Sequence, residues 1–384
     1  MSAPRLRCSS WIVWGMGAWI ATVTCAELGT RGNQSAQAQE GTQAKDEAKR
    51  LTAARQEALE FLRTTQSDDG SWTSPTAPGI SGLVLAAAIR GGAKLDDPMV
   101  VKGLAHLSSF VRDDGGIYDL KSDHRNYETS ICLLAFHAAN QNGRFDALIG
   151  KARDFLKQLQ WDDSEGAGPD DPRYGGAGYG KSQRPDLSNT AFLLEALKAS
   201  GVDANDPAMK KALVFISRCQ NLESEHNTTP FASKVNDGGF YYTPAAGGNS
   251  QAGPTDNGGL RSYSSMTYAG LKSMIYAGLK PDDPRVAAAF KWIQKHYTVE
   301  ENPGMGQQGL FYYFHTFAKA LQTMQVKTVT DANGRMHDWR QELRQHVLSL
   351  QQKNGSWVNP EKRWMEGDPN LATAYALLTL AYCD

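Results

Sequence analysis

Apolar and polar positions are arranged along the chain in a way that predicts repeated pairs of helices. The segments 95–100, 204–209 and 281–286 share an Asp-Pro step, in which the aspartate caps a helix and the proline occupies its first position. The helices that follow carry apolar residues at helical spacing, as at Phe290 and Ile293. Each runs into a loop of glycine and aromatic residues and then into a second helix with smaller side chains. One repeat is therefore a helix, a loop and a helix.

Six loops of this kind indicate six repeats. The loops lie at 69–72, 114–117, 176–179, 237–240, 309–312 and 354–357. The second helices are expected at about 79–90, 127–140, 187–200, 263–277, 311–323 and 371–383. The first helices are expected to begin near Leu51, Pro98, Phe145, Pro207, Pro284 and Met336. Such repeats bury both faces only by stacking, which predicts an all-α fold of about six helix pairs, either a solenoid or a closed ring, with the smaller second helices on the inner side.

The N-terminal segment lacks this pattern and is typical of a signal peptide. Arg5 and Arg7 precede an uncharged stretch at 11–23, and small residues at 24–26 suit cleavage. We therefore expect a signal peptide over 1–26 and export to the periplasm or the extracellular space. Membrane association is expected only if this segment is retained as an anchor.

The next segment, 27–49, is rich in Gln, Ala, Gly, Thr and charged residues and almost lacks large apolar side chains. This composition predicts a flexible linker. The toroid domain is accordingly expected over 50–384.

Charge and cysteine content exclude several function classes. The 40 basic and 41 acidic residues give a net charge of −1, so no overall field attracts nucleic acid. Cys132, Cys219 and Cys383 lie in apolar helical contexts and are expected to be buried thiols. The sequence contains no Cys-X-X-Cys, His-Glu-X-X-His, Walker or Gly-X-Ser-X-Gly motif. No cofactor is therefore expected.

The repeat loops resemble a motif of known proteins. Gln66 with Gly70-Ser71-Trp72, and Gln351 with Gly355-Ser356-Trp357, are similar to the Gln-Trp repeats of squalene and oxidosqualene cyclases. Residues 50–384 resemble the α/α-toroid superfamily that includes these terpenoid cyclases and the β subunits of protein prenyltransferases. The resemblance implies a toroid with a central aromatic cavity for a hydrophobic, isoprenoid-type ligand. Trp72 and Trp357 are interpreted as packing residues between repeats.

The acid motif of class II cyclases has a degenerate counterpart here. Their Asp-X-Asp-Asp sequence matches Asp186-Leu187-Ser188-Asn189, in which Ser188 replaces the proton donor. A hydroxyl cannot protonate an alkene, so cyclisation of the squalene type is not expected. Asp186, Ser188 and Asn189 could equally cap the inner helix. If the chain is an enzyme, Asp186 and Glu128 are the candidate catalytic carboxylates.

The zinc site of the prenyltransferases is matched only at one position. His315 corresponds to their ligand histidine, but Arg261-Ser262-Tyr263 offers neither carboxylate nor thiolate, so no metal site is expected. The remaining candidates are residues at the mouths and walls of the inner ring. As ligand-binding residues the sequence favours Ser188, Asn189, Tyr174, Tyr179, Tyr263, Tyr313, His315 and Trp364.

Three functions stay open. The first is an exported toroid, enzyme or enzyme relative, that takes a hydrophobic isoprenoid-type molecule into an aromatic cavity. The second is a non-catalytic toroid that binds a ligand or a protein partner. The third is a polysaccharide-active enzyme, which would need two carboxylates facing one cavity.

Overall fold

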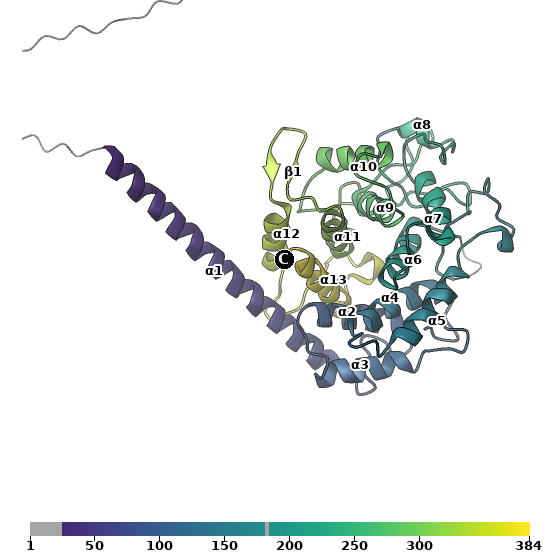
Figure 1. The fold of residues 1–384 in the computed structure, drawn as a ribbon, viewed down its shortest axis with the longest axis horizontal. Coiled ribbons are helices and arrows are strands. Elements are labelled where there is room, and N and C mark those ends of the chain that lie inside the picture. Colours follow the sequence, from purple (N-terminus) through teal and green to yellow (C-terminus); the bar gives the residue numbers. More distant parts are fainter. Residues whose placement is uncertain (1–24, 181–183) are drawn as a thin grey trace, which may run out of the picture. The chain divides into compact units, whose positions relative to one another are not determined.

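Six helices stand around the axis of a ring (Figure 1). The computed structural model describes residues 25–180 and 184–384, with side chains from Lys45 onward. Each inner helix packs against the next, and the last packs against the first, so the ring is closed. Their side chains are buried on nearly all sides, which explains why small and apolar residues dominate them. The inner helices are α2 (Pro78–Arg90), α4 (Arg125–Ala138), α6 (Leu187–Ala199), α9 (Ser264–Tyr276), α11 (Leu310–Thr323) and α13 (Pro369–Tyr382).

An outer layer of helices covers this ring. Asp97, Asp206 and Asp283 each accept a hydrogen bond from the backbone N–H two residues further on, and a proline follows each of them. The predicted Asp-Pro helix starts are therefore confirmed, and the α/α toroid is the observed fold. The outer helices are α3 (Pro98–Ser108), α5 (Asp146–Lys157), α7 (Pro207–Arg218), α10 (Pro284–Lys295), α12 (Trp339–Ser349) and the C-terminal part of α1 (Cys25–Thr65).

Short elements interrupt the repeats at a few places. The predicted inner helices agree with the observed ones to within two residues at each end. The last outer helix begins at Trp339 rather than near Met336, because Met336 pairs with Thr330 in a hairpin and Asp338 caps the helix. The short elements are η1 (Asp163–Glu165), α8 (Ala232–Val235), β1 (Val329–Thr330), β2 (Met336–His337) and η2 (Arg363–Met365).

Glycine is required in the loops because they touch the neighbouring repeat. Five loop glycines have φ between +80° and +91°, and a Cβ at any of them would lie within 2.7 Å of a backbone oxygen of the next outer helix. The last of these contacts joins the final loop to Glu57 of α1, which closes the outer layer. The five are Gly70, Gly115, Gly175, Gly238 and Gly355.

The glutamine and tryptophan of the repeat motif also join elements. Gln220 Nε2 donates to Gly238 O of its own loop and to Arg285 O of the next outer helix, both at 2.9 Å. Gln66, Gln160 and Gln351 make the same pair of bonds in their repeats. The indoles of Trp72 and Trp357 are fully buried and donate to backbone oxygens of the preceding outer helices. The motif is thus structural, as the sequence predicts for the two tryptophans.

The N-terminal part of the chain forms a separate unit. The chain divides into two compact units, residues 1–51 and 52–384. Helix α1 runs through 27–49, which differs from the flexible linker that the composition favours. The Ala, Gln, Glu and Lys residues there are good helix formers, and no proline interrupts them. Most of the predicted signal peptide, residues 1–24, lies outside the described residues. Within the described ranges, no helix is both long and apolar enough to cross a membrane.

Candidate functional site

The candidate residues gather mainly at the end of the ring where the inner helices begin. The loops from outer to inner helices all lie at this end, which we call the mouth. Asp186 is the N-cap of α6, with Ser188 and Asn189 in its first turn, and Glu128 lies in the first turn of α4. Tyr263 is the N-cap of α9. Tyr174, Tyr179 and Trp364 lie in the loops that precede α6 and α13, and Tyr313 and His315 lie in α11.

Asp186 is a buried helix cap. Its Oδ1 accepts from the backbone N–H of Asn189 at 2.9 Å, and its Oδ2 accepts from Asn189 Nδ2 at 2.8 Å. Only 2% of the residue is exposed, and this burial raises the pKa of Asp186 to about 6. The Tyr242 hydroxyl also hydrogen-bonds the carboxyl. Asp186 is therefore a helix cap whose carboxyl group binds its proton more tightly than an exposed aspartate does.

The substitution Asp186→Asn is expected to keep the cap and remove a pH dependence. The pKa of about 6 lies above the ordinary 3.8, so the folded protein binds this proton more tightly than the unfolded chain. The free energy of unfolding should therefore fall by about 2 kcal/mol as the pH rises from 4 to 6. Asparagine caps about as well as aspartate, and the buried Asn189 Oδ1, which has no partner among the described residues, can accept from the new amide.

Urea unfolding of both proteins at pH 4, 5, 6 and 7 measures this difference. In the variant, the free energy of unfolding should no longer show the pH dependence that Asp186 causes. Its value at pH 7 should be retained. Equal slopes in the two proteins would contradict the assignment of a raised pKa to Asp186.

Ser188 takes part in a different contact. Its Oγ lies 3.0 Å from the hydroxyl of Tyr312, which projects from α11 across the ring. The cap is thus formed by Asp186 and Asn189, while Ser188 joins α6 to α11. Position 188, where a class II cyclase carries its proton donor, is part of a hydroxyl pair here.

Glu128 is a second buried carboxyl at the mouth. Its Oε2 accepts from the backbone N–H of Asp119 at 3.1 Å, and its Oε1 accepts from Ser122 Oγ at 2.7 Å. Burial raises the pKa of Glu128 to about 7. Because Glu128 is tied to the loop before α4 and Asp186 to α6 itself, the two carboxyls have separate partners and do not form a hydrogen-bonded pair.

Five aromatic residues form a continuous group at the mouth, which we call the aromatic cluster. It consists of Tyr127, Tyr179, Phe192, Tyr312 and Tyr375, whose successive ring centroids lie 5.5 to 6.2 Å apart. The rings come from α4, the loop before α6, α6, α11 and α13. Tyr179 is the outermost member, with 36% of its surface exposed.

Two predicted tyrosines are not members of the aromatic cluster. Tyr313 donates to Thr298 O at 2.7 Å and packs against Tyr268 and Phe317, between the inner and outer layers. Tyr174 lies in a turn within electrostatic range of Arg218 on α7. One side of an inner helix faces the ring axis and the other faces the outer helices. When both sides are apolar, the sequence pattern does not distinguish them, and for this reason Tyr313 was predicted to face the cavity.

Trp364 lies at the mouth on an unusual backbone. It is 44% exposed, and both Trp364 and Met365 have left-handed φ values, +54° and +63°. Such values are uncommon for residues other than glycine. The guanidinium of Arg363 lies 4.2 Å from the centre of the indole ring and hydrogen-bonds Gln251 at 2.6 Å. This arrangement holds an aromatic side chain in solvent.

A small cavity lies inside the ring. A cavity beneath the aromatic cluster has a volume of about 20 Å³, which accommodates about one water molecule. Its polar lining comes from Arg90, Glu195, His315 and Tyr382, and its apolar lining includes Phe192. Aromatic residues that the sequence favours as the lining of a large cavity, such as Tyr179, pack against other aromatic rings.

Sequence analysis missed a group of buried charges deeper in the ring. Lys272 Nζ lies 2.5 Å from Glu195 Oε2, and Lys319 Nζ lies 3.4 Å from Glu195 Oε1. His315, 3% exposed, lies beside them and faces Tyr382. A signal exists in the sequence: Lys272 is the one charged residue of α9, and Glu195 lies among apolar residues of α6.

No metal site is formed by the residues with described positions. They contain no group of three or more His, Cys, Asp or Glu side chains arranged to hold a metal ion. Cys132, Cys219 and Cys383 are buried thiols, as predicted.

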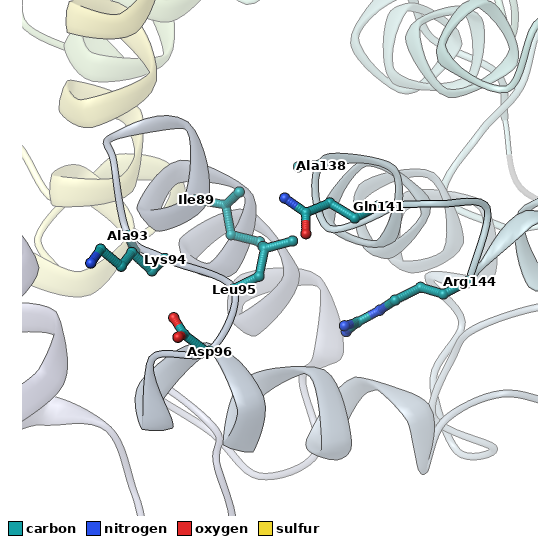
Figure 2. A pocket seen from close by; sticks show the side chains of 8 residues that line it. All are labelled: Ile89, Ala93, Lys94, Leu95, Asp96, Ala138, Gln141 and Arg144. Carbon is teal, nitrogen blue, oxygen red and sulfur yellow. The ribbon is translucent and has the colours of Figure 1, made fainter.

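A larger cleft lies outside the ring, at the ends of α2 and α4 (Figure 2). Its volume is about 620 Å³. In Figure 2, Arg144 extends toward the segment that carries Asp96, while Lys94 points away. None of the predicted site residues lines this cleft, whose lining residues are Ile89, Ala93, Lys94, Leu95, Asp96, Ala138, Gln141 and Arg144.

The arrangement of inner and outer helices defines the protein as an α/α toroid. No family model matches the chain, and no curated protein sequence matches it. Solved structures of the type II terpene cyclase MstE from Scytonema are similar to it over 88% of this chain. One, in complex with geranylgeranyl dihydroxybenzoate, is covered over 99% of its length, with 13% identity and a TM-score of 0.35. Another, in complex with merosterolic acid A, is covered over 98%, with 14% identity and a TM-score of 0.31.

Proposed function

We propose that this chain is an exported toroid that binds a hydrophobic, isoprenoid-type molecule at the mouth of its ring and does not catalyse class II cyclisation. The observation that carries the proposal is the aromatic surface at the mouth. Tyr179 is exposed on the aromatic cluster, and Trp364 is held in solvent by a left-handed backbone. A protein rarely retains an exposed tryptophan on a strained backbone without a use for it.

The volume of the interior supports binding at the mouth rather than inside the ring. A cavity of about 20 Å³ is far smaller than the several hundred Å³ that enclosing sites for organic ligands provide. An isoprenoid would therefore lie across the aromatic cluster and against the indole of Trp364. Flat aromatic faces suit such a molecule because they bury apolar surface without needing matched hydrogen bonds.

The acid motif supports a role in binding rather than catalysis. Ser188 is paired with Tyr312, and Asp186 is occupied as a cap of α6. One observation favours a second function: the pKa of Asp186 is raised to about 6, which would suit a general acid. If Asp186 is such an acid, Asp186→Asn abolishes turnover of a substrate at unchanged stability.

Binding is tested with the mature chain from Glu27 onward and with farnesol as the probe, by isothermal titration calorimetry. We expect saturable binding that is at least tenfold weaker in Trp364→Gly. Glycine suits the left-handed φ of +54°, so this variant should be as stable as the unchanged protein or more stable. Weaker farnesol binding without a loss of stability would identify Trp364 as a residue that contacts the ligand.

The control variant is Met336→Ala. Met336 is 67% exposed and lies on β2, away from the mouth, so farnesol binding should not change. Mass spectrometry of an organic extract of the secreted protein supplies a second measurement, with a co-purifying isoprenoid as the expected result. If farnesol does not bind and no lipid co-purifies, the proposal is overturned, and a protein partner at the same surface is favoured. Formation of cyclised products from squalene would contradict the non-catalytic part.

Export is the remaining part of the proposal. It is supported by the sequence of residues 1–26, with Arg5 and Arg7 before an uncharged stretch and small residues at 24–26. N-terminal sequencing of the protein from its producing cells should give Glu27 as the first residue. An intact N-terminus would indicate an anchor instead.

A further inference from the structure

The group of buried charges inside the ring contains more positive than negative charge. The ammonium groups of Lys272 and Lys319 share the single carboxylate of Glu195. Glu195 is 6% exposed, Lys272 is 2% exposed, and the side chain of Lys319 is 11% exposed. Attraction between these groups lowers the pKa of Glu195 and raises that of Lys319, while burial lowers the pKa of Lys272. The contacts of 2.5 and 3.4 Å place two amino groups around one carboxylate. Protonation of both amino groups gives the three a net charge of one positive unit in a nearly dry environment.

The surrounding residues add to this positive charge. Arg90, at the C-terminal end of α2, lies 5.9 Å from the ring centre of Tyr382. Burial lowers the pKa of His315 to about 3, and the charges of Lys272, Lys319 and Arg90 act in the same direction. His315 is therefore neutral, and the buried positive charge is not balanced by it.

These cations do not serve as ordinary caps of helix C-termini. Cations near a helix C-terminus usually offset its partial negative charge. Here Lys272 donates to Glu195, and Lys319 donates to the Tyr382 hydroxyl at 2.9 Å. Both ammonium groups thus turn toward side chains in the ring rather than toward the last carbonyls of their own helices.

An unoccupied hydrogen-bonding position lies at the same place. His315 lines the cavity of about 20 Å³ together with Arg90, Glu195 and Tyr382. His315 Nδ1 is buried and has no hydrogen-bond partner among the described residues. A buried polar atom of this kind normally finds a partner. The cavity therefore combines excess positive charge, an unused imidazole nitrogen and space for about one small particle.

We propose that this cavity binds one small monovalent anion, of about the size of chloride, beside Arg90 and His315. Lys319 lies behind the cavity wall, where it hydrogen-bonds the Tyr382 hydroxyl. The anion would offset the excess positive charge and accept a hydrogen bond from Nδ1 of His315. Glu195 does not repel it strongly, since both carboxylate oxygens already face ammonium groups. This site is separate from the mouth and does not depend on the proposed ligand.

The test compares the thermal stability of the full chain in sodium chloride and in sodium gluconate at constant ionic strength. Gluconate is too large for the cavity and serves as the inert anion. We expect the unfolding midpoint to rise by about 2 °C or more with chloride and to saturate, as it does for a ligand that binds only the folded state. Lys319→Met should abolish this rise.

The matched control is Lys198→Gln, which removes an exposed cation in the last turn of the neighbouring α6 and should leave the chloride response unchanged. Arg90→Gln, at an exposed position, supplies a second variant if Lys319→Met does not fold, and it should weaken the response at least threefold. Crystals grown in bromide should show an anomalous peak beside His315. Equal midpoints in the two salts, an unchanged response in the site variants, or bromide only at exposed positions would each overturn the proposal.

Discussion

Gly175→Ala should destabilise the ring by about 3 kcal/mol or more, one of the two largest effects that we expect from a single substitution. Gly175 has a φ of +80°, and an added Cβ would lie 1.8 Å from the backbone oxygen of Lys211 in α7. The left-handed conformation alone costs about 1 to 2 kcal/mol for alanine, and the clash with backbone atoms adds at least as much. Because the loop between α5 and α6 packs against α7 of the next repeat at this point, the added Cβ must push two repeats apart.

Gly201→Ala is the matched control for this prediction. Gly201 also has a left-handed φ, +85°, but an added Cβ there meets no atom within 4 Å. Its substitution should therefore cost only the conformational penalty. Urea unfolding of both variants separates the two effects, and equal losses of stability would show that the contact between repeats contributes nothing.

The periodic part of this fold could be predicted from the sequence because each repeat signals its own boundaries. The Asp-Pro steps at Asp97, Asp206 and Asp283 are local caps, and they begin helices wherever the next residues can continue one. The loop glycines also mark the loops in the sequence, although the reason for a glycine there is a close contact with the next repeat. Stacking of the repeats allows either an open solenoid or a closed ring, and the resemblance of the repeat loops to those of α/α toroids implied the ring.

The sequence does not predict the start or the cap of a helix where contacts with distant parts of the chain determine them. Met336 has an apolar side chain at a plausible helix start, but the hairpin turn before it places Met336 in β2. Glu366 illustrates the same limit, because it accepts hydrogen bonds from the backbone N–H groups of Phe311 and Tyr312 and so caps α11 from another repeat. Gly309, at the N-cap of α11, has no side chain for this task. No local pattern reveals such a cap.

The candidate site was predicted in its location more than in its shape. The residues at the mouth were recognisable because they follow the loops, and Asp186 was recognisable as a cap. Whether aromatic side chains surround a space or fill it depends on their packing, which the sequence does not specify. The aromatic cluster fills the mouth, and the remaining space lies beside His315 and Glu195.

Glu195→Gln should be the most destabilising substitution of a polar residue inside the ring, at about 3 to 5 kcal/mol. The change removes the carboxylate that pairs with the two buried amino groups of Lys272 and Lys319, and unpaired buried charges are costly. One buried lysine should then lose its proton more easily. Its pKa in the folded state would fall below the ordinary value, so the unfolded chain would bind more protons and the stability of the variant should rise with pH between about 7 and 10.

Two further variants make this result specific. Adding Lys272→Met to Glu195→Gln removes one of the unpaired charges and should recover part of the loss, as expected for coupled neighbours. Glu60→Gln changes a carboxylate whose side chain is 64% exposed and should alter the stability by no more than about 0.5 kcal/mol. Urea unfolding at pH 7 and pH 9 measures all three variants. If Glu195→Gln is as stable as Glu60→Gln, the lysines are not held as buried ammonium groups, and the excess positive charge on which the anion site depends is absent.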